Sequence, residues 1–340
     1  MTSADRYRDA GVDLDAAERA MDRIAAAVKS TRTELALGAH GAFGGMVRVP
    51  GEIAAPVLVT STDGVGTKIL VAIRAGRHDT IGEDLVNHCV DDILVHGATP
   101  IAFLDYIAAA SIDPETIAPL VEGVARGCRA HHMTLTGGET AELPDLYHVG
   151  HYDLAGTIIG VVDERDAIHA EAVRAGDVLV GYASNGLHTN GYTLARRIVF
   201  DELGWDVDHE IPGVGELVGD ALLRVHRSYA ASVRAMLSRI HGLAHITGGG
   251  IPGNLSRVIP DGCGAVVQSS SWVVPPLFQF LESAGHVSRE EMFRVFNMGV
   301  GMIGAVAPGA VNDVVAAAET AGVPAWTIGE VVDGSGVQVV

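Results

Sequence analysis

The sequence predicts a two-domain protein of the α/β (α+β) class, and three observations support this fold class. Short apolar segments rich in β-branched residues alternate with segments of helical periodicity along the whole chain. The chain has 340 residues, of which 48% are hydrophobic and 19% charged, which is enough for two globular domains. A charged stretch at 163–177 separates two halves of similar make-up, and we place the boundary near residue 167. The expected domains are therefore 1–167 and 168–340.

The first half is expected to begin with an amphipathic helix at 13–30, followed by a glycine-rich loop at 38–52. Asp113 and Pro114 are typical of an N-cap and a first helical position, so a helix is expected to start there. The two glycines before Glu139 predict that a strand runs into a turn. The remaining elements expected in this half are helices at 79–97 and 113–132 and strands at 56–62, 101–109, 133–139 and 154–162.

The second half is expected to repeat this mixture of strands and helices. A strand at 178–184 leads into a polar loop at 184–191 and then a helix at 193–203. A long helix is expected at 220–240, because its apolar residues recur with helical spacing. A strand, a glycine-rich loop and a short helix follow it.

Charge and cysteine content exclude several classes of protein. The net charge of −19 repels DNA, RNA and anionic membranes, and a phosphorylated ligand would need a cation to bind. Three isolated cysteines without a C-x-x-C pattern support neither a disulfide framework nor a cysteine zinc site. No run is apolar and long enough to span a bilayer, and the N-terminus lacks the apolar core of a signal peptide. We therefore expect a cytoplasmic protein with no nucleic-acid or membrane partner.

Residues 61–70, STDGVGTKIL, are the first candidate for chemistry. The stretch does not satisfy the P-loop pattern, because its glycines are too close together and Ile69 follows the lysine. Asp63 at a strand end suits a magnesium ligand, and Lys68 suits a point charge on nucleotide phosphates. A simple turn capped by the aspartate explains the stretch equally well. Gly64, Gly66 and Thr67, between the two charges, are assigned to nucleotide binding together with them.

A second set of acids lies on the predicted helix at 79–97. Asp84, His88 and Asp92 fall at i, i+4 and i+8 on one face, with Asp91 alongside. Repeated acids usually mark a solvated face, but a bound cation also offsets their repulsion. We expect His88 to be a surface or packing histidine and not a ligand, because a hard cation prefers oxygen. Glu139 repeats the design of Asp63, with a helix-capping turn as its alternative.

Two loops of the second half suit a phosphate group. In SNGLHTNGY, hydroxyl and amide side chains and two glycines precede a helix, whose N-terminus favours an anion. Thr189 or Asn190 is expected to cap that helix, and His188 to contact substrate or act as an acid or base near neutral pH. The residues assigned to substrate binding in this loop are Ser184, Asn185, His188, Thr189, Asn190 and Gly191.

The loop HITGGGIPGN formally contains the dinucleotide pattern G-x-G-x-x-G at 248–253. We reject NAD binding, because Pro252 interrupts the pattern and no acid follows about 20 residues later to bind a ribose. Gly248, Gly249 and Arg257 are instead expected to approach a second phosphate or the substrate.

Taken together, these stretches resemble the phosphoribosylformylglycinamidine cyclo-ligases, also called AIR synthetases, over nearly the whole chain. The resemblance lies in DGVGTK (63–68), RHDTIGEDLV (77–86), FLDYIA (103–108), GGETAELP (137–144), HTNGYTLAR (188–196), HITGGG (245–250) and FNMGVGM (296–302). It implies an enzyme of purine biosynthesis that uses ATP to phosphorylate the formyl amide oxygen of formylglycinamidine ribonucleotide. An amidine nitrogen then closes the imidazole ring, and ADP and phosphate leave.

The resemblance also implies cofactors, partners and roles for residues. ATP and Mg²⁺ are expected, with K⁺ as a further candidate, and the N-terminal domain is expected to pair its mixed sheet across a homodimer. Lys29 and the loop 41–45, with Gly44 and Gly45, would fold over the nucleotide. Asp63, Asp92 and Glu139 would bind the metal, and Lys68, His188 and Asp92 would act in catalysis. The sequence departs from the resemblance at Asp91, where relatives commonly show asparagine, and at Asn185, where serine is common.

Two alternatives stay open at this point. Thiamine-phosphate kinase shares the acidic metal-binding pattern, although the HTNGYTLAR and FNMGVGM segments point away from it. A non-catalytic nucleotide-binding regulator on the same scaffold is the alternative from a different class, and the presence of Asp63, Lys68 and Glu139 argues against it.

Overall fold

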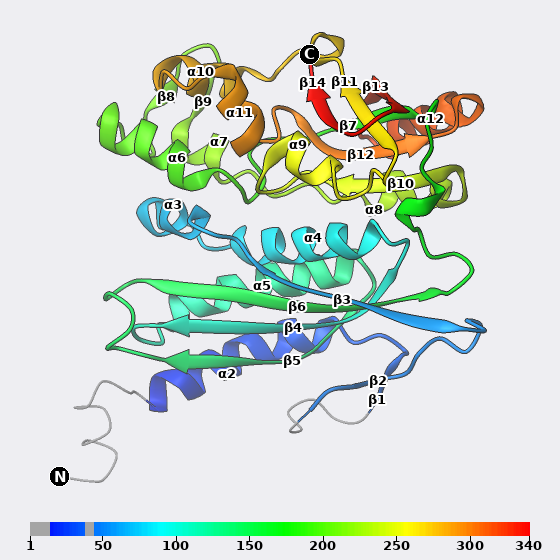
Figure 1. The fold of residues 1–340 in the computed structure, drawn as a ribbon. Coiled ribbons are helices and arrows are strands. Elements are labelled where there is room, and N and C mark those ends of the chain that lie inside the picture. The colour runs from blue at the N-terminus through cyan, green and yellow to red at the C-terminus, as the bar shows by residue number, and fades with distance from the viewer. Residues whose placement is uncertain (1–13, 38–43) are drawn as a thin grey trace, which may run out of the picture.

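The computed structural model describes residues 14–37 and 44–340. The start of the first predicted helix and residues 41–43 of the predicted nucleotide loop lie outside these ranges. Two α/β layers are stacked on each other, one from the first half of the chain and one from the second (Figure 1). In the part of the chain that the structure describes, no helix combines the length and apolar character needed to cross a membrane.

The first layer is a four-stranded sheet with helices on one face. Its strand order is β3-β6-β4-β5, and only β4 and β5 are parallel. Helix α4 packs on the sheet, α5 packs beside α4, and α2 packs on α5 (Figure 1). The elements are α2 (Leu14–Ser30), β1 (Ala36–Leu37), β2 (Met46–Val47), β3 (Pro56–Gly64), α3 (Lys68–Ala75), α4 (Ile81–Leu94), β4 (Thr99–Ala109), α5 (Pro114–Ala130), β5 (Thr134–Glu142) and β6 (Tyr152–Asp163).

The second layer is a six-stranded sheet with the order β10-β12-β7-β13-β11-β14. Its strands are β7 (Val178–Ala183), β10 (Ile240–His245), β11 (Cys263–Val267), β12 (Val300–Val306), β13 (Ala325–Asp333) and β14 (Gly336–Val339), with a small ribbon of β8 (Glu210–Ile211) and β9 (Glu216–Leu217). Its helices are α6 (Tyr192–Arg196), α7 (Val218–Leu222), α8 (Ala230–Val233), α9 (Gly250–Leu255), α10 (Pro276–Ala284), α11 (Arg289–Val295) and α12 (Val311–Thr320). The predicted division at residue 167 falls between the last strand of the first sheet and the first strand of the second.

The predicted helices and strands of the first half are confirmed, with one exception. Asp113 caps α5, because its Oδ1 accepts a hydrogen bond from the backbone N–H of Glu115 at 3.1 Å. The turn expected at the two glycines before Glu139 is wrong, because β5 continues through Glu142. Pairing with β4 stays in register as far as Ala109 and Glu142, and this ladder satisfies backbone groups that a turn would leave free.

The long helix expected at 220–240 is also wrong. Helix α7 ends at Leu222, and the next helical residue is Ala230. Between them, the backbone N–H groups of His226 and Tyr229 donate to Asp84 Oδ1 at 2.7 Å and Asp91 Oδ1 at 2.8 Å. Both carboxylates are buried on α4, so the chain gives up helical hydrogen bonds to satisfy them.

Helix α4 lies between the first sheet and the second domain (Figure 1). Twelve of its residues are buried, among them Asp84, Asn87, His88 and Asp91. A helix buried on all sides must place its polar side chains against polar partners, and these partners come from the second domain. The polar face of α4 therefore forms the junction between the domains.

Candidate functional site

Three loops that the sequence analysis singled out meet at this junction. The β3–α3 loop contacts the HTNGYT loop, since Thr67 and Thr193 share a hydrogen bond of 3.0 Å between their hydroxyls. Gly66, with φ of +55°, lies against the carbonyl oxygen of Thr189. Gly248 faces the side-chain oxygen of Asn190. Segments more than 50 residues apart in sequence thus form one polar site.

Lys68 and Asp84 form a fully buried ion pair in this site. The ammonium donates to Asp84 Oδ1 at 2.8 Å and to the backbone carbonyls of His188 at 3.1 Å and Arg224 at 2.6 Å. Burial raises the pKa of Asp84 to about 6, against the opposing effect of the Lys68 charge, and burial also lowers the pKa of Lys68. The expectation that Lys68 contacts nucleotide phosphates is not met, because its three donor positions are used inside the protein.

His88 connects the first domain to the second. Its Nε2 lies 2.8 Å from Asp63 Oδ2 and 3.7 Å from Asp92 Oδ2, and its Nδ1 lies 2.7 Å from the hydroxyl of Thr189. Burial opposes the charged imidazole, but the hydrogen bond to Asp63 and the charge of Asp92 outweigh it and raise the pKa of His88. Sequence reasoning gave His88 an ordinary packing role, whereas the structure places it at the centre of the polar network.

Asp63 and Asp92 lie on the two sides of this histidine and together suit a hard cation. Asp92 accepts from Ser61 Oγ at 2.9 Å and contacts His245 Nδ1 at 2.9 Å. Burial alone would raise the pKa of both acids, but their histidine partners lower it, so both are ionised at neutral pH. Their side chains keep 47% and 24% exposure, which leaves oxygen atoms open to a ligand. Mg²⁺ commonly binds one or two such carboxylates and completes its shell with water and phosphate oxygens.

Glu139 does not join this pair, which corrects the expected three-carboxylate metal site. The register runs from Asp63 through Gly156 and Asp105 to Gly138, so Glu139 lies three strand spacings away, about 14 Å. Its side chain also points to the opposite face of the sheet, because Asp63 faces α4 and residues alternate along each strand. In this chain the Glu139 carboxylate accepts from the backbone N–H of Thr140.

The residues expected to cover a nucleotide form a separate pocket at the β5 edge. A cavity of about 780 Å³ is lined by Lys29, Arg32, Gly45, Met46 and residues 134–136, among others. Gly45 needs to be glycine there, because a Cβ would overlap Thr136, whereas Gly44 has open space around it. The predicted nucleotide and metal residues therefore divide between two places in one chain, the β5 edge and the domain junction.

Several predicted substrate residues brace the loops of the second domain. Ser184 Oγ donates to Asn297 Oδ1 at 2.8 Å, and Asn185 Nδ2 donates to the carbonyl of Val225 at 2.8 Å. The expected capping of α6 by Thr189 or Asn190 is wrong, because the N-cap is Gly191 at φ of +79° without a side-chain cap. The side chains of Ser184 and Asn185, which we expected to bind substrate, make hydrogen bonds within the protein because the loop is buried.

His188 is buried in the same loop at a backbone φ of +63°. Its ring lies 4.0 Å, centroid to centroid, from that of His226. Within the described residues, neither of its ring nitrogens has a hydrogen-bond partner. Burial and the surrounding histidine and lysine groups hold its pKa well below the usual range, so the imidazole is neutral. The sequence suggested that His188 acts as an acid or base near neutral pH, but in this environment its pKa lies too low for it to act as an acid there.

An open cleft of about 350 Å³ runs along the junction beside these residues. It is lined by polar groups of both domains, including Ser61, Asp92, His245, Thr247 and Arg257. Arg257 is exposed there and pairs with no acid in the described chain, so its charge is available to an anion. Sequence reasoning identified Arg257 and Asp92 but missed His245 and His226. The polar run at 224–229, which interrupts an otherwise helical pattern, was the available signal for the second of these.

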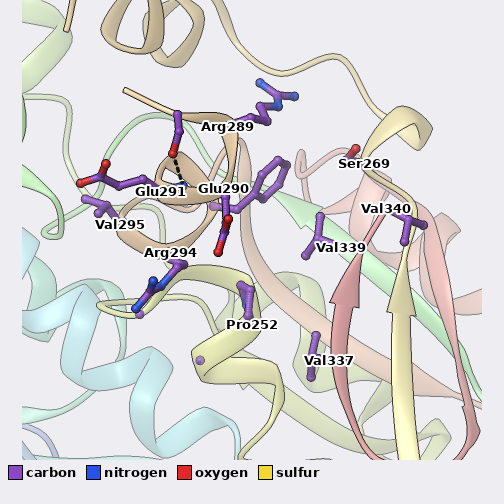
Figure 2. A pocket seen from close by; sticks show the side chains of 14 residues that line it. Pro252, Ser269, Arg289, Glu290, Glu291, Arg294, Val295, Val337, Val339 and Val340 are labelled. Atoms are coloured by element: carbon purple, nitrogen blue, oxygen red, sulfur yellow. Dashed lines mark hydrogen bonds between the residues drawn. The ribbon is translucent and has the colours of Figure 1, made fainter. Parts of the chain in front are cut away.

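A larger cavity, of about 1240 Å³, opens on the other side of the glycine loop, between α9, α11 and β14 (Figure 2). Gly249, at φ of +97°, belongs to its lining together with Pro252, Arg289 and Arg294. Asn254 shapes the loop from beneath, donating to the carbonyls of Thr247, Gly248 and Gly250. Gly248 therefore faces the domain junction, while Gly249 faces this outer cavity.

Fold and site together define a two-domain α/β protein with an acidic, histidine-rich cleft between its domains, suited to a cation-bound anionic ligand. Comparison with known proteins gives the family. Residues 45–162 match the N-terminal domain of AIR synthase related protein, and residues 174–340 match its C-terminal domain. The chain therefore belongs to the AIR synthase related family.

Relatives match along nearly the full length of the chain. It is 46% identical to phosphoribosylformylglycinamidine cyclo-ligase of Desulfatibacillum aliphaticivorans, over 96% of this chain and 94% of the relative. It is also 46% identical to the protein of the same name in Sorangium cellulosum, over 96% and 95% of the two chains.

Solved structures of low sequence identity share the fold. Thiamine-monophosphate kinase from Stenotrophomonas maltophilia superposes with a TM-score of 0.72 at 18% identity, covering 94% of this chain and 95% of that one. The E. coli hydrogenase maturation protein HypE gives 0.67 at 19% identity, covering 93% and 92%. At these identities the likeness shows the fold alone.

Proposed function

We propose that this chain is a phosphoribosylformylglycinamidine cyclo-ligase, an ATP-dependent ligase of purine biosynthesis that closes the imidazole ring of aminoimidazole ribonucleotide. The observation that carries the proposal is the identity of 43–46% over 96–97% of the chain with relatives of that name. The thiamine-monophosphate kinase structure shares the fold at 18% identity, which carries no argument for its activity in this chain. A cytoplasmic location and a requirement for Mg²⁺ belong to the same proposal.

The junction cleft supplies groups that suit this reaction. Asp63 and Asp92 would hold Mg²⁺, which supplies charge neutralisation on the phosphate oxygens of ATP when bound. Arg257, free of acidic partners in the described chain, would bind the ribose phosphate of the substrate. Lys68 acts from within the fold: it holds the carbonyls of His188 and Arg224, and so positions the loops on both sides of the cleft.

His188 and its neighbours would orient the substrate for ring closure. A ring closure within one molecule gains most from correct orientation of the reacting atoms, and less from a strong base. His188 is neutral and lacks partners for both ring nitrogens among the described residues, so it offers one donor and one acceptor. The neutral imidazole thus suits hydrogen bonding to the formyl amide or the amidine of formylglycinamidine ribonucleotide.

A homodimer through the first sheet is the partner arrangement we propose. The sheet face opposite α4 exposes Leu58, Thr60, Thr62 and Tyr106, and the described helices leave it uncovered (Figure 1). Leu58, on the edge strand β3, keeps 58% exposure, and Tyr106, on the inner strand β4, keeps 42%, so this face exposes large apolar and aromatic side chains. Glu139 points to this same face, so dimerisation is the step that would give its carboxylate new neighbours.

Incubation of the purified chain with ATP, Mg²⁺ and formylglycinamidine ribonucleotide tests the proposal. We expect aminoimidazole ribonucleotide and ADP to form in equal amounts. Thiamine phosphate in place of the ribonucleotide should give no phosphorylated product, and its phosphorylation would instead establish the kinase alternative. Absence of ring closure with folded, ATP-binding protein would refute the proposal.

Matched variants locate the site. Asp92→Asn should lower turnover by a factor on the order of 100 or more, because it removes a cation ligand and the partner of His245. Asp313→Asn changes an exposed acid on α12 outside the cleft and should leave turnover unchanged. Arg257→Gln should raise KM for the ribonucleotide more than it lowers kcat, since it removes a contact to a group that does not react.

A further inference from the structure

Three buried imidazoles from both domains converge beside the carboxylate pair. His88 comes from α4, His245 from the end of β10, and His226 from the segment that replaces the expected helix. Their ring centroids are 5.0 to 5.4 Å apart. Each ring offers one nitrogen such that the three atoms all lie within 4.8 Å of one another. All three imidazoles are buried, with His245 at the edge of the junction cleft, whereas the side chains of Asp63 and Asp92 keep 47% and 24% exposure.

The hydrogen bonds around His245 leave a lone pair inside the cluster, whereas a metal ion would replace one of the two present partners of His88, Asp63 Oδ2 or the Thr189 hydroxyl. Asp92 accepts from Ser61 Oγ at 2.9 Å, and a carboxylate that also accepts from His245 places the proton on Nδ1 in their 2.9 Å hydrogen bond. The Nε2 of His245 then carries no proton, and its lone pair faces His226 Nε2. A carboxylate behind a histidine is the arrangement that orients a metal-binding imidazole.

The spacing of the nitrogens fits a tetrahedral ion. His245 Nε2 and His226 Nε2 lie 3.3 Å apart, which is long for a hydrogen bond. In a tetrahedral site with metal–nitrogen bonds of about 2.0–2.1 Å, neighbouring ligand atoms are roughly 3.3–3.4 Å apart. A metal ion bound by both rings would therefore require little movement of either one.

A buried oxygen atom beside the cluster lacks a hydrogen-bond partner in the described part of the chain. Asp91 is fully buried, and its Oδ2 has no hydrogen-bond partner among the described residues. That oxygen lies 3.8 Å from His226 Nε2. A buried oxygen without a partner beside three imidazoles indicates a group that the described residues do not supply.

We propose that His88, His226 and His245 form a binding site for a transition-metal dication, with Zn²⁺ as the best match, that joins the two domains. Imidazole nitrogens select such ions over Mg²⁺, which prefers oxygen, so this site adjoins the hard-cation pair Asp63 and Asp92 but takes a different kind of ion. The cysteine pattern gave no reason to expect zinc, because the ligands are histidines from three separate segments. The site goes beyond the proposed reaction and does not depend on it.

Titration of the metal-stripped full chain with Co²⁺, a spectroscopic substitute for Zn²⁺, tests the proposal. We expect one Co²⁺ per chain, visible absorption bands of the intensity seen for four-coordinate ions, and no displacement by millimolar Mg²⁺. Zn²⁺ should displace Co²⁺ and raise Tm of the chain, because it binds only the folded state with its domains together. Weak binding that Mg²⁺ reverses, or the pale spectrum of a six-coordinate ion, would overturn the site.

Variants assign the ligands. His226→Gln should weaken Co²⁺ binding at least about tenfold and remove the four-coordinate spectrum. His241→Gln is the matched control, because His241 also pairs with a carboxylate, Asp177 at 2.8 Å, but lies outside the cluster. His88→Met repeats the test from the first domain if His226→Gln proves poorly folded. Unchanged Co²⁺ affinity in folded His226→Gln or His88→Met would contradict the assignment.

Discussion

Replacing Lys68 by methionine separates two roles that a lysine in this loop can have. If Lys68 neutralises Asp84 inside the fold, as the structure indicates, Lys68→Met should destabilise the protein. If Lys68 instead serves nucleotide phosphates, the variant should fold normally and lose activity. Methionine keeps most of the volume of the side chain, so the comparison isolates the charge and its hydrogen bonds.

The expected cost follows from the burial of the pair. Both side chains have zero exposure, and among the described residues Lys68 is the only cation bonded to Asp84. Removing one member of a buried ion pair leaves an uncompensated charge and costs about 3–5 kcal/mol. The double variant Lys68→Met, Asp84→Asn should be more stable than Lys68→Met by roughly 1–3 kcal/mol, since it removes the stranded carboxylate. The asparagine oxygen can still accept from the N–H of His226.

Chemical denaturation of the wild type, both single variants and the double variant gives the four free energies of a cycle. Measurements at pH 5 and pH 8 add a second criterion. The pKa of Asp84 is already raised to about 6, and loss of Lys68 raises it further. A carboxyl group whose pKa is raised in the folded state lowers the free energy of unfolding as pH rises. The difference in unfolding free energy between wild type and Lys68→Met should therefore grow from pH 5 to pH 8.

A Lys68→Met protein as stable as wild type at pH 8 would refute the reasoning. If the stable Lys68→Met protein had also lost ATP-dependent turnover, the result would support the other role. Lys68 would then separate from Asp84 during the reaction and bind the nucleotide phosphates. Equal stability of Lys68→Met and the double variant would likewise show that the two charges are not coupled.

Three further outcomes follow from the structure. Burial raises the pKa of Asp105 to about 7, so the contribution of Asp105 to stability is present near pH 4 and lost as pH rises through 7. Asp105→Asn should therefore stabilise the chain by about 2–4 kcal/mol at pH 8 and not at pH 4. Chemical denaturation at both pH values measures this difference. Gly250→Ala should cost about 3 kcal/mol or more, because φ is +61° and a Cβ would overlap the carbonyl of Phe293, whereas Gly253→Ala meets no atom and should be neutral or slightly stabilising. His188→Asn, which tolerates the φ of +63°, should lower kcat while leaving ATP affinity by calorimetry nearly unchanged, and equal loss of both would contradict a role in orienting the substrate.

Local sequence determined most of the elements and the positions of the loops. The helix starting after Asp113 forms where its cap and its proline are, and the strands of the first sheet follow their apolar runs. These features depend on hydrogen bonds and periodicity within a few residues, so the sequence contains what is needed to predict them. The loops DGVGTK, HTNGYT and HITGGG were identified for the same reason, since glycine and small polar residues mark them locally.

Only the tertiary structure decided which of the marked residues meet. Lys68 points into the protein and pairs with Asp84, because a buried carboxylate on α4 without a cation would be strongly destabilising. Buried Asp84 and Asp91 also took backbone donors from 224–229 and so broke a helix that local periodicity predicted. Glu139 was separated from Asp63 by strand order, and His88, His226 and His245 were gathered from three segments. Such contacts depend on the packing of one domain against the other, and no window of the sequence contains both partners.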